Sequence, residues 1–146
     1  MDQEGIKNYV AKLVKRYNTR NPFSLADNLN IIVLNVPLGE LQGCYMYLKR
    51  HRVIFINSDI ENATIKNVIL AHEIGHALLH TKINCYFMQK NTLLNTTKYE
   101  TQANLFAAEL LVSDEIIKSN PGMNNMQIAA IAGVVPELLK YKNLST

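Results

Sequence analysis

The sequence predicts an α+β fold with three strands, one central helix and further helices toward the C-terminus. The segments 31–36, 41–48 and 53–56 have the composition of strands and are bounded by turn residues. Residues 62–80 contain no proline and are apolar around nearly the whole helical wheel, as in a buried helix. With 146 residues, 48% of them hydrophobic, the chain is long enough for one core, so we expect a single domain over residues 1–146.

The N-terminal part of the chain predicts two helices. Apolar residues between Ile6 and Tyr17 recur on one helical face, and lysine and arginine occupy the other face. The next residues, up to a proline, break this helix. Ser24, with Asp27 three residues later, has the spacing of an N-terminal cap. We therefore expect a second, short helix that runs through Leu29.

The strand segments predict a sheet that contains one hairpin. The segment 31–36 ends at Pro37, which lacks the N–H needed for strand pairing. Residues 49–52, Lys-Arg-His-Arg, are expected to form the turn of a hairpin between the other two strands. His51 would then be an exposed turn residue rather than a metal ligand. If the strand 53–56 lies at the sheet edge, it can bind an extended peptide by strand addition.

The C-terminal half predicts a loop and then helices. Residues 81–96 are mostly polar and irregular, and we expect a loop over the functional site. Helical spacing follows at 97–112, at 113–120, and at two short segments, 124–132 and 136–143. The segment 123–143 loosely resembles a helix-turn-helix, but its would-be recognition helix offers only Lys140 and Lys142 as cations. A helical hairpin packed on the core is therefore expected, without direct nucleic-acid binding.

The central helix carries the pattern His72-Glu73-x-x-His76. Side chains four residues apart are neighbours on a helix, so both imidazoles can bind one metal ion. Glu73 is turned about 100° from His72 on the wheel and can reach a water molecule and accept its proton. A single histidine on an apolar face usually belongs to a packed core, but two histidines around a glutamate are more specific. The pattern predicts a zinc-dependent hydrolase.

A catalytic zinc site needs three protein ligands, and three residues compete for the third position. His80 repeats the four-residue spacing but lies about 12 Å from His72 along a continuous helix, so we place it at the helix end beside the ligands. Glu100 and Glu109 lie about 180° apart on the next helix, so only one can face the metal. Small residues surround Glu100 and allow the two helices to approach closely. We therefore predict Glu100 as the third ligand.

The roles of Asn104 and Glu100 have alternatives at this point, and the donor that stabilises the oxyanion remains open. Asn104, one helical turn after Glu100, is predicted to orient that carboxylate; the alternative is an ordinary helix-packing asparagine. Glu100 itself can alternatively form a capping box with Thr97. A donor that stabilises the oxyanion is also needed. The candidates for it are Tyr45, Tyr47, Tyr86, Tyr99 and His80.

Several short motifs of the sequence resemble those of a known protein family. The histidine motif is followed by Glu100-x-x-Ala103-Asn104, and it is accompanied by Gly43-x-Tyr45, Ile54-x-Ile56-Asn57, Gly133-Val134 and Leu138-x-x-Tyr141. Together they resemble the ImmA/IrrE family of zincin-like metallopeptidases over most of the chain. Val112-Ser113 departs from the Met-Pro of many members, which affects only the helix exit.

The resemblance implies a zincin-like fold, with a small three-stranded sheet packed on the central helix. It also implies metal ligands at His72, His76 and Glu100, and Glu73 as the general base. Members of the family are commonly encoded in phages or mobile elements. There they lie beside a helix-turn-helix repressor that they cleave or inactivate. The resemblance therefore implies a protein substrate of this kind.

Composition narrows the partners and the compartment. The formal charge of +3 is too small to indicate nucleic acid or an anionic membrane. No apolar run reaches the roughly 20 residues of a membrane span, and the N-terminus lacks the pattern of a signal peptide. We therefore expect a cytoplasmic protein. Cys44 and Cys85 are isolated and are expected to be reduced, since a disulfide requires that the fold bring them together.

The sequence thus predicts a zinc endopeptidase that acts on a cytoplasmic protein. The alternative is a regulatory binding module that keeps the scaffold but controls a repressor by association alone. The complete ligand set and the presence of Glu73 favour the enzyme.

Overall fold

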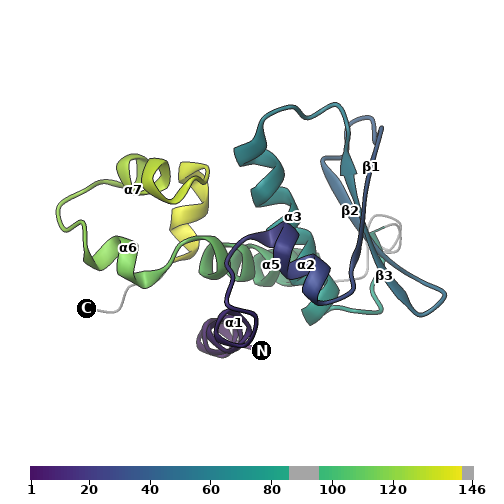
Figure 1. Cartoon of the computed structure of the whole chain (residues 1–146), viewed down its shortest axis with the longest axis horizontal. Coiled ribbons are helices and arrows are strands. Elements are labelled where there is room, and N and C mark those ends of the chain that lie inside the picture. The colour runs from purple at the N-terminus through teal and green to yellow at the C-terminus, as the bar shows by residue number, and fades with distance from the viewer. Residues whose placement is uncertain (86–95, 143–146) are drawn as a thin grey trace.

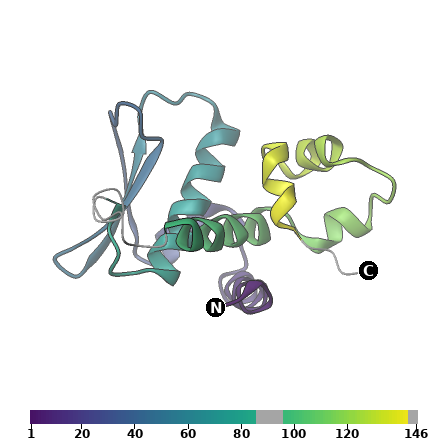
Figure 2. The same cartoon turned by 180° about the vertical axis from the view of Figure 1, so that it is seen from behind.

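In the computed structural model, which describes residues 1–85 and 96–142, a three-stranded sheet packs against a central helix (Figure 1). The strands are β1 (Ile32–Val36), β2 (Gly43–Leu48) and β3 (His51–Asn57). The helices are α1 (Gln3–Tyr17), α2 (Pro22–Asn28), α3 (Ala63–Leu79), α5 (Thr96–Leu111), α6 (Asp114–Lys118), α7 (Asn125–Ala132) and the 3-10 helix η1 (Pro136–Tyr141). The expected α+β architecture is confirmed. Seen from either side, α6, α7 and η1 gather at the end of the molecule away from the sheet (Figure 2).

The sheet has the order β1-β3-β2, with β3 parallel to β1 and antiparallel to β2. The condition for strand addition at residues 53–56, an edge position, is therefore not met. The chain passes from β1 to the far edge and returns as a hairpin, which leaves the middle position for β3. That position also suits the apolar run Val53–Ile56, since the backbone of a central strand is paired on both sides. The edge strand beside the functional site is β2.

The hairpin turn is tighter than the sequence predicts. Only Lys49 and Arg50 form it, with φ of 49° and 67°, as in a two-residue turn whose twist matches the strands. His51 and Arg52 are strand residues that pair with Leu48 and Tyr47. His51 is nevertheless exposed, as expected.

The helix predictions hold for the long helices and need correction for α2. α2 begins at Pro22, and Asn21 is its cap: the Asn21 side chain accepts hydrogen bonds from the backbone N–H groups of Phe23 and Ser24. The prediction of Ser24 as the cap is wrong. Proline suits the first helical position because the N–H that it lacks would be unpaired there, so the helix already begins at Pro22, before Ser24. α3 is capped by Asn62, whose side chain accepts from the Ile65 N–H.

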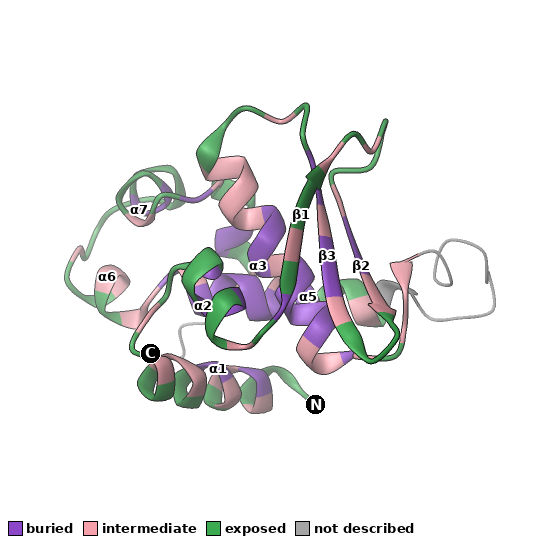
Figure 3. Cartoon of the chain, turned by 45° about the vertical axis from the view of Figure 1, so that its right-hand side comes forward, coloured by how far each residue is buried: buried purple, intermediate pink, exposed green. Residues whose placement is uncertain are grey.

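Contact between α3 and α5 depends on small residues. A Cβ atom added at Gly75 of α3 would lie 3.1 Å from Ala103 Cα and 3.1 Å from Phe106 Cβ of α5. The two helices therefore approach too closely for a side chain at Gly75. The buried residues of α3, α5, β2 and β3 form the centre of the core (Figure 3).

The C-terminal segments pack on that core. Ile128 and Ala129 of α7 and Leu138 and Leu139 of η1 belong to the same buried cluster as α3 and α5. The expected helix at 136–143 is a shorter 3-10 helix. The single-domain prediction for residues 1–146 stays a prediction, because 86–95 and 143–146 lie outside the described residues. The predicted loop 81–96 falls largely in the first of these ranges.

A buried ion cluster fastens the end of η1 to α5 and α1. Lys142 Nζ lies 2.9 Å from Glu109 Oε2 and 2.7 Å from Asp114 Oδ1, and its side chain is only 1% exposed. Lys7 Nζ lies 2.9 Å from Asp114 Oδ2. Burial raises the pKa of Asp114, but hydrogen bonds from Lys142 and Lys7 outweigh that effect and lower the pKa to about 2.

Acid is therefore expected to remove the contribution of Asp114 to folding. Its carboxyl titrates near 3.9 in an unfolded chain, so the unfolded state binds the proton first as the pH falls. The stabilisation is complete above about pH 4 and is lost as the pH falls toward about 2. Urea unfolding of the wild type and Asp114→Asn at several pH values should show a stability difference at pH 6 that shrinks toward pH 2. A difference that does not change with pH would contradict this assignment.

Candidate metal centre

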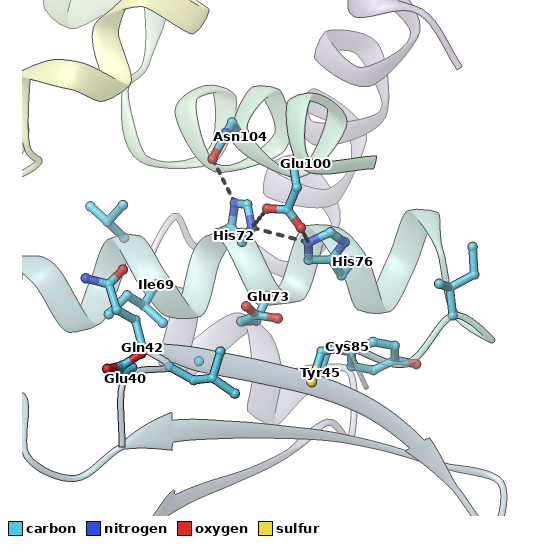
Figure 4. A pocket seen from close by; sticks show the side chains of 14 residues that line it. Glu40, Gln42, Tyr45, Ile69, His72, Glu73, His76, Cys85, Glu100 and Asn104 are labelled. Carbon is cyan, nitrogen blue, oxygen red and sulfur yellow. Dashed lines mark hydrogen bonds and ion pairs between the residues drawn. The ribbon is translucent and has the colours of Figure 1, made fainter. Parts of the chain in front are cut away.

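His72, His76 and Glu100 meet where α3 and α5 face each other (Figure 4). Glu100 Oε2 lies 2.9 Å from His72 Nε2, and Glu100 Oε1 lies 3.1 Å from His76 Nε2. The two Nε2 atoms are 3.2 Å apart. One ligand atom from each residue lies within 4.8 Å of the others, a group that can hold a metal ion. Two imidazoles and one carboxylate are also a donor set that zinc accepts.

The structure brings Glu100, rather than Glu109, to the histidines. Glu109 lies on the opposite side of α5 and pairs with Lys142. The alternative of a capping box with Thr97 does not describe Glu100, because α5 already begins at Thr96 and the carboxylate lies between the two imidazoles.

Asn104 contacts His72 instead of Glu100, which corrects the predicted target of this residue. Asn104 Oδ1 lies 2.8 Å from His72 Nδ1, and Asn104 Nδ2 donates to the Tyr141 hydroxyl at 3.1 Å. With the amide in this orientation, Oδ1 accepts a proton from His72 Nδ1. The Nε2 lone pair of His72 is then directed toward Glu100 and His76, as a metal ligand requires. The prediction missed this contact because it considered only residues one turn apart on α5, whereas His72 approaches Asn104 from α3.

A similar chain of hydrogen bonds fixes His76. Gln102 Nε2 donates to the Met1 carbonyl at 2.9 Å, and Gln102 Oε1 accepts from His80 Nε2 at 2.7 Å. With its proton on Nε2, neutral His80 can only accept at Nδ1, which lies 3.1 Å from His76 Nδ1. His76 therefore carries its proton on Nδ1 and keeps the Nε2 lone pair free. His80 is the C-terminal cap residue of α3, where the sequence places it.

The electrostatics of the site keep His80 neutral and Glu100 ionised. Burial lowers the pKa of His80, which favours the neutral form that accepts from His76. Hydrogen bonds with His72 and His76 hold the pKa of Glu100 well below its usual range. For His72, burial lowers the pKa, but the hydrogen bond with Glu100 and the negative charges of Glu73 and Glu100 together raise it above its usual value. The carboxylate of Glu100 is thus ionised next to two imidazoles.

Substitution of His80 by leucine is expected to weaken metal binding about 10- to 100-fold, because the His76 imidazole loses the acceptor that fixes its tautomer. Competition with a chromophoric chelator measures this affinity. His51→Leu changes an exposed histidine of the β2–β3 hairpin and serves as the control. Equal affinities for the two variants would refute the role of His80.

Glu73 lies beside the ligands but does not join them (Figure 4). The backbone N–H of Tyr45 donates a hydrogen bond to its carboxylate, and a Cβ atom at Gly43 would lie 3.2 Å from Glu73 Cγ. Glycine at position 43 therefore lets strand β2 approach this side chain closely. Burial raises the pKa of Glu73, partly offset by His72 and His76. A raised pKa suits a carboxylate that takes up a proton near neutral pH.

These residues line a cavity of about 700 Å³ between β2 and α3. Of the oxyanion candidates in the described part of the chain, only Tyr45 lines it, and the Tyr45 hydroxyl donates to the Thr81 carbonyl at 2.5 Å. Tyr99 packs its ring against His80, and Tyr47 lines a separate depression. Tyr86 lies outside the described residues. The oxyanion donor thus stays unassigned.

Cys44 and Cys85 form a disulfide, so the expectation of two reduced thiols is wrong for this structure. Their Cα atoms are 5.6 Å apart, because the chain after α3 passes beside β2. Cys85 lines the cavity. Two isolated cysteines 41 residues apart carry no local signal of this pairing.

Sequence reasoning also missed Gln102 and Tyr141 as supports of the histidines. Their contacts join residues 22 and 37 positions apart. Helical periodicity does not report contacts over such separations. The motif Leu138-x-x-Tyr141 was one signal that could have pointed to Tyr141.

Comparison with known proteins agrees with the geometry of the site. The sequence profile of a peptidase family, Peptidase M78, described as the IrrE N-terminal-like domain, matches residues 26–143. Uncharacterized immunity region protein 2 of Bacillus phage phi105 is 41% identical over 143 residues, which cover 96% of this chain and 90% of that protein. Metallopeptidase ImmA of Bacillus subtilis (strain 168) is 30% identical over 145 residues, 95% of this chain and 84% of that protein. The chain therefore belongs to the ImmA/IrrE family of zincin-like metallopeptidases.

Proposed function

We propose that this chain is a zinc-dependent endopeptidase that cleaves a cytoplasmic protein, and that its substrate is a helix-turn-helix repressor of a phage or mobile element. The observation that carries the proposal is the group of His72, His76 and Glu100 with Glu73 beside it. The name of the phage relative, an immunity region protein, supports the phage context. The name metallopeptidase of the second relative supports the reaction.

In the proposed mechanism, His72, His76 and Glu100 hold the metal, while Asn104 and His80 keep the two imidazoles in the required tautomers. When bound, a zinc ion supplies Lewis acidity for the peptide carbonyl and for the attacking water. Glu73 accepts the proton of that water and then delivers it to the leaving amine. The hydrogen bond from the Tyr45 N–H keeps the carboxylate of Glu73 beside the cavity.

The edge strand β2 is a suitable place for an extended substrate. Its partner β3 uses the backbone groups on one side, as the hydrogen bond from Asn57 N to Gln42 O shows. On the other side, the N–H of Tyr45 bonds Glu73 and that of Tyr47 bonds Asn84 Oδ1. By alternation the peptide groups of Gly43 point to the same free side, where a substrate strand can pair with them.

The structure offers little support for nucleic acid as a partner. The second helix of the loose helix-turn-helix is the 3-10 helix η1, with Leu138 and Leu139 buried. Lys142, one of its two expected cations, is buried against Glu109.

Among the helices of residues 1–85 and 96–142, none has the length and apolar composition of a membrane span.

The test is incubation of the purified protein with the helix-turn-helix repressor encoded nearest to its gene. Zinc-loaded protein should cut the repressor at one peptide bond into two fragments, and mass spectrometry of the fragments identifies that bond. Removal of the metal with a chelator should stop cleavage, and zinc should restore it. If the repressor stays intact but is bound and inactivated, the binding-module alternative replaces the endopeptidase.

A further inference from the structure

The cavity extends from the histidines along α3 toward the N-terminal end of that helix. Val68 and Ile69, one turn before His72, line this part from the helix. Glu40, Leu41 and Gln42 line it from the loop that precedes β2. Figure 4 shows Glu40, Gln42 and Ile69 together at this end, to one side of His72 and Glu73. None of these loop residues has a role in the proposed chemistry.

The loop is held in place by one buried side chain, that of Asn57, which is 5% exposed. Asn57 Nδ2 donates to the Gly39 carbonyl at 3.0 Å and to the Leu41 carbonyl at 2.9 Å. Asn57 Oδ1 accepts from the backbone N–H of Asp59 at 3.0 Å and from that of Leu38 at 3.4 Å. One side chain at the end of the central strand thus fixes the loop backbone on both sides of Glu40.

The side chains that this loop brings to the cavity form an amphipathic surface. Leu41 is 37% exposed, and it lines the cavity together with the half-buried Val68, so the two apolar side chains are open to a ligand there. Glu40 is exposed and forms no ion pair with any described residue. The described residues that line the cavity include three glutamates and neither lysine nor arginine.

Such a surface matches a long cationic side chain. Lysine and arginine place an aliphatic stem on apolar groups while the charged head stays in water or meets an acid. Arginine, with its planar fork, is the better partner for a carboxylate. A short or acidic side chain would leave Leu41 uncovered or would meet the negative charge of Glu40.

We propose that loop 38–42, fastened by Asn57, forms a substrate-selecting subsite, in which Leu41 and Val68 cover the stem of an arginine or lysine of the substrate and Glu40 pairs with its charge. This subsite rests on the proposed peptidase function and specifies its substrate: an extended peptide with a cationic residue near the scissile bond. Glu40 is the specificity-determining residue and Asn57 is a positioning residue.

The first test uses the zinc-loaded full chain and a mixture of decapeptides that contain arginine, lysine, norleucine or glutamate at each position in turn. Cleavage by the wild type should favour arginine or lysine at one position relative to the cut. In Glu40→Gln the preference over norleucine should fall about two- to fivefold, the range for a partly exposed ion pair. Glu40→Lys should favour glutamate at that position. Glu137→Lys makes the same charge change at an exposed residue of η1 and should leave the preference unchanged.

A binding measurement separates this subsite from the proposed chemistry. Fluorescence anisotropy of labelled arginine and norleucine peptides is measured on the wild type and on Glu40→Gln. Equal discrimination by both proteins would overturn the subsite, whether or not cleavage occurs. Binding that depends on Glu40 without any cleavage would overturn the endopeptidase and leave the subsite standing.

The second test addresses Asn57. Asn57→Asp keeps the size of the side chain but cannot donate to the Gly39 and Leu41 carbonyls. We expect KM for arginine peptides to rise about two- to fivefold, because a loosened loop loses the contribution of one partly exposed ion pair. The kcat and the metal content should stay unchanged. Asn8→Asp on the exposed face of α1 is the control. A fall in kcat that is equal for arginine and norleucine peptides would mean that Asn57 has only a structural role.

Discussion

Replacement of Glu73 by glutamine is expected to reduce cleavage of the protein substrate by at least about 10²-fold, the lower range for a positioned general base. Glutamine keeps the size and polarity of the side chain but cannot take up a proton. Its amide oxygen can still accept the hydrogen bond from the Tyr45 N–H, so the contact between α3 and β2 remains. We therefore expect normal folding and near-normal zinc content.

The measurement is cleavage of the repressor in vitro, with the metal content and the binding of the repressor determined on the same preparation. Gln42→Glu is a useful companion, because it adds a carboxylate elsewhere in the cavity and should not restore activity when combined with Glu73→Gln. Loss of zinc in Glu73→Gln would make Glu73 a structural residue. Retention of zinc with full biological activity would favour a protein that acts by binding.

The parts of the fold that local patterns govern could be predicted from the sequence. α1, α3 and α5 follow from apolar spacing, and their observed ends lie within a few residues of the expected ones. The proximity of His72 and His76 is a property of any helix. The choice of Glu100 over Glu109 needed only the helical phase and the small residues around Glu100.

The features that failed depend on contacts between distant segments. The central position of β3 is decided by which strand the hairpin returns beside, and no local pattern reports that. Asn104 was assigned to Glu100 because both lie on α5, whereas the crossing of α3 brings His72 to it. The Cys44–Cys85 bond has the same origin. In each case the residue type indicated an interaction, but the sequence did not identify its partner.

The residues that support the proposed metal ligands come from both ends of the chain as well as from α5. Gln102 fixes His80 and is itself held by the Met1 carbonyl, while Asn104 is held by Tyr141 of η1. The N-terminus and the C-terminal helix thus both contact residues that orient His72 or His76. Changes at either end of the chain are therefore expected to reach the site through hydrogen bonds.

The pair Glu100→Ala and Glu109→Gln tests the ligand set most directly. In the proposed metal centre Glu100 supplies one of the three ligand groups. Its side chain is 48% exposed, so alanine should remove metal binding without unfolding the protein. After dialysis, zinc should fall from one ion per chain to a small fraction, as it should in His76→Ala. Elemental analysis gives the metal content, and circular dichroism confirms that the fold persists.

Glu109→Gln should behave in the opposite way. Lys142 loses its buried counter-charge and keeps only Asp114, so the free energy of unfolding should fall, by up to about 3 kcal/mol. Glutamine is used instead of alanine because its oxygen can still accept from Lys142, which keeps the protein folded for the metal assay. One zinc per chain should remain, because the two glutamates lie on opposite sides of α5. If Glu109→Gln lost its metal while Glu100→Ala kept it, the orientation of α5 against α3 would be wrong, and with it the proposed metal centre.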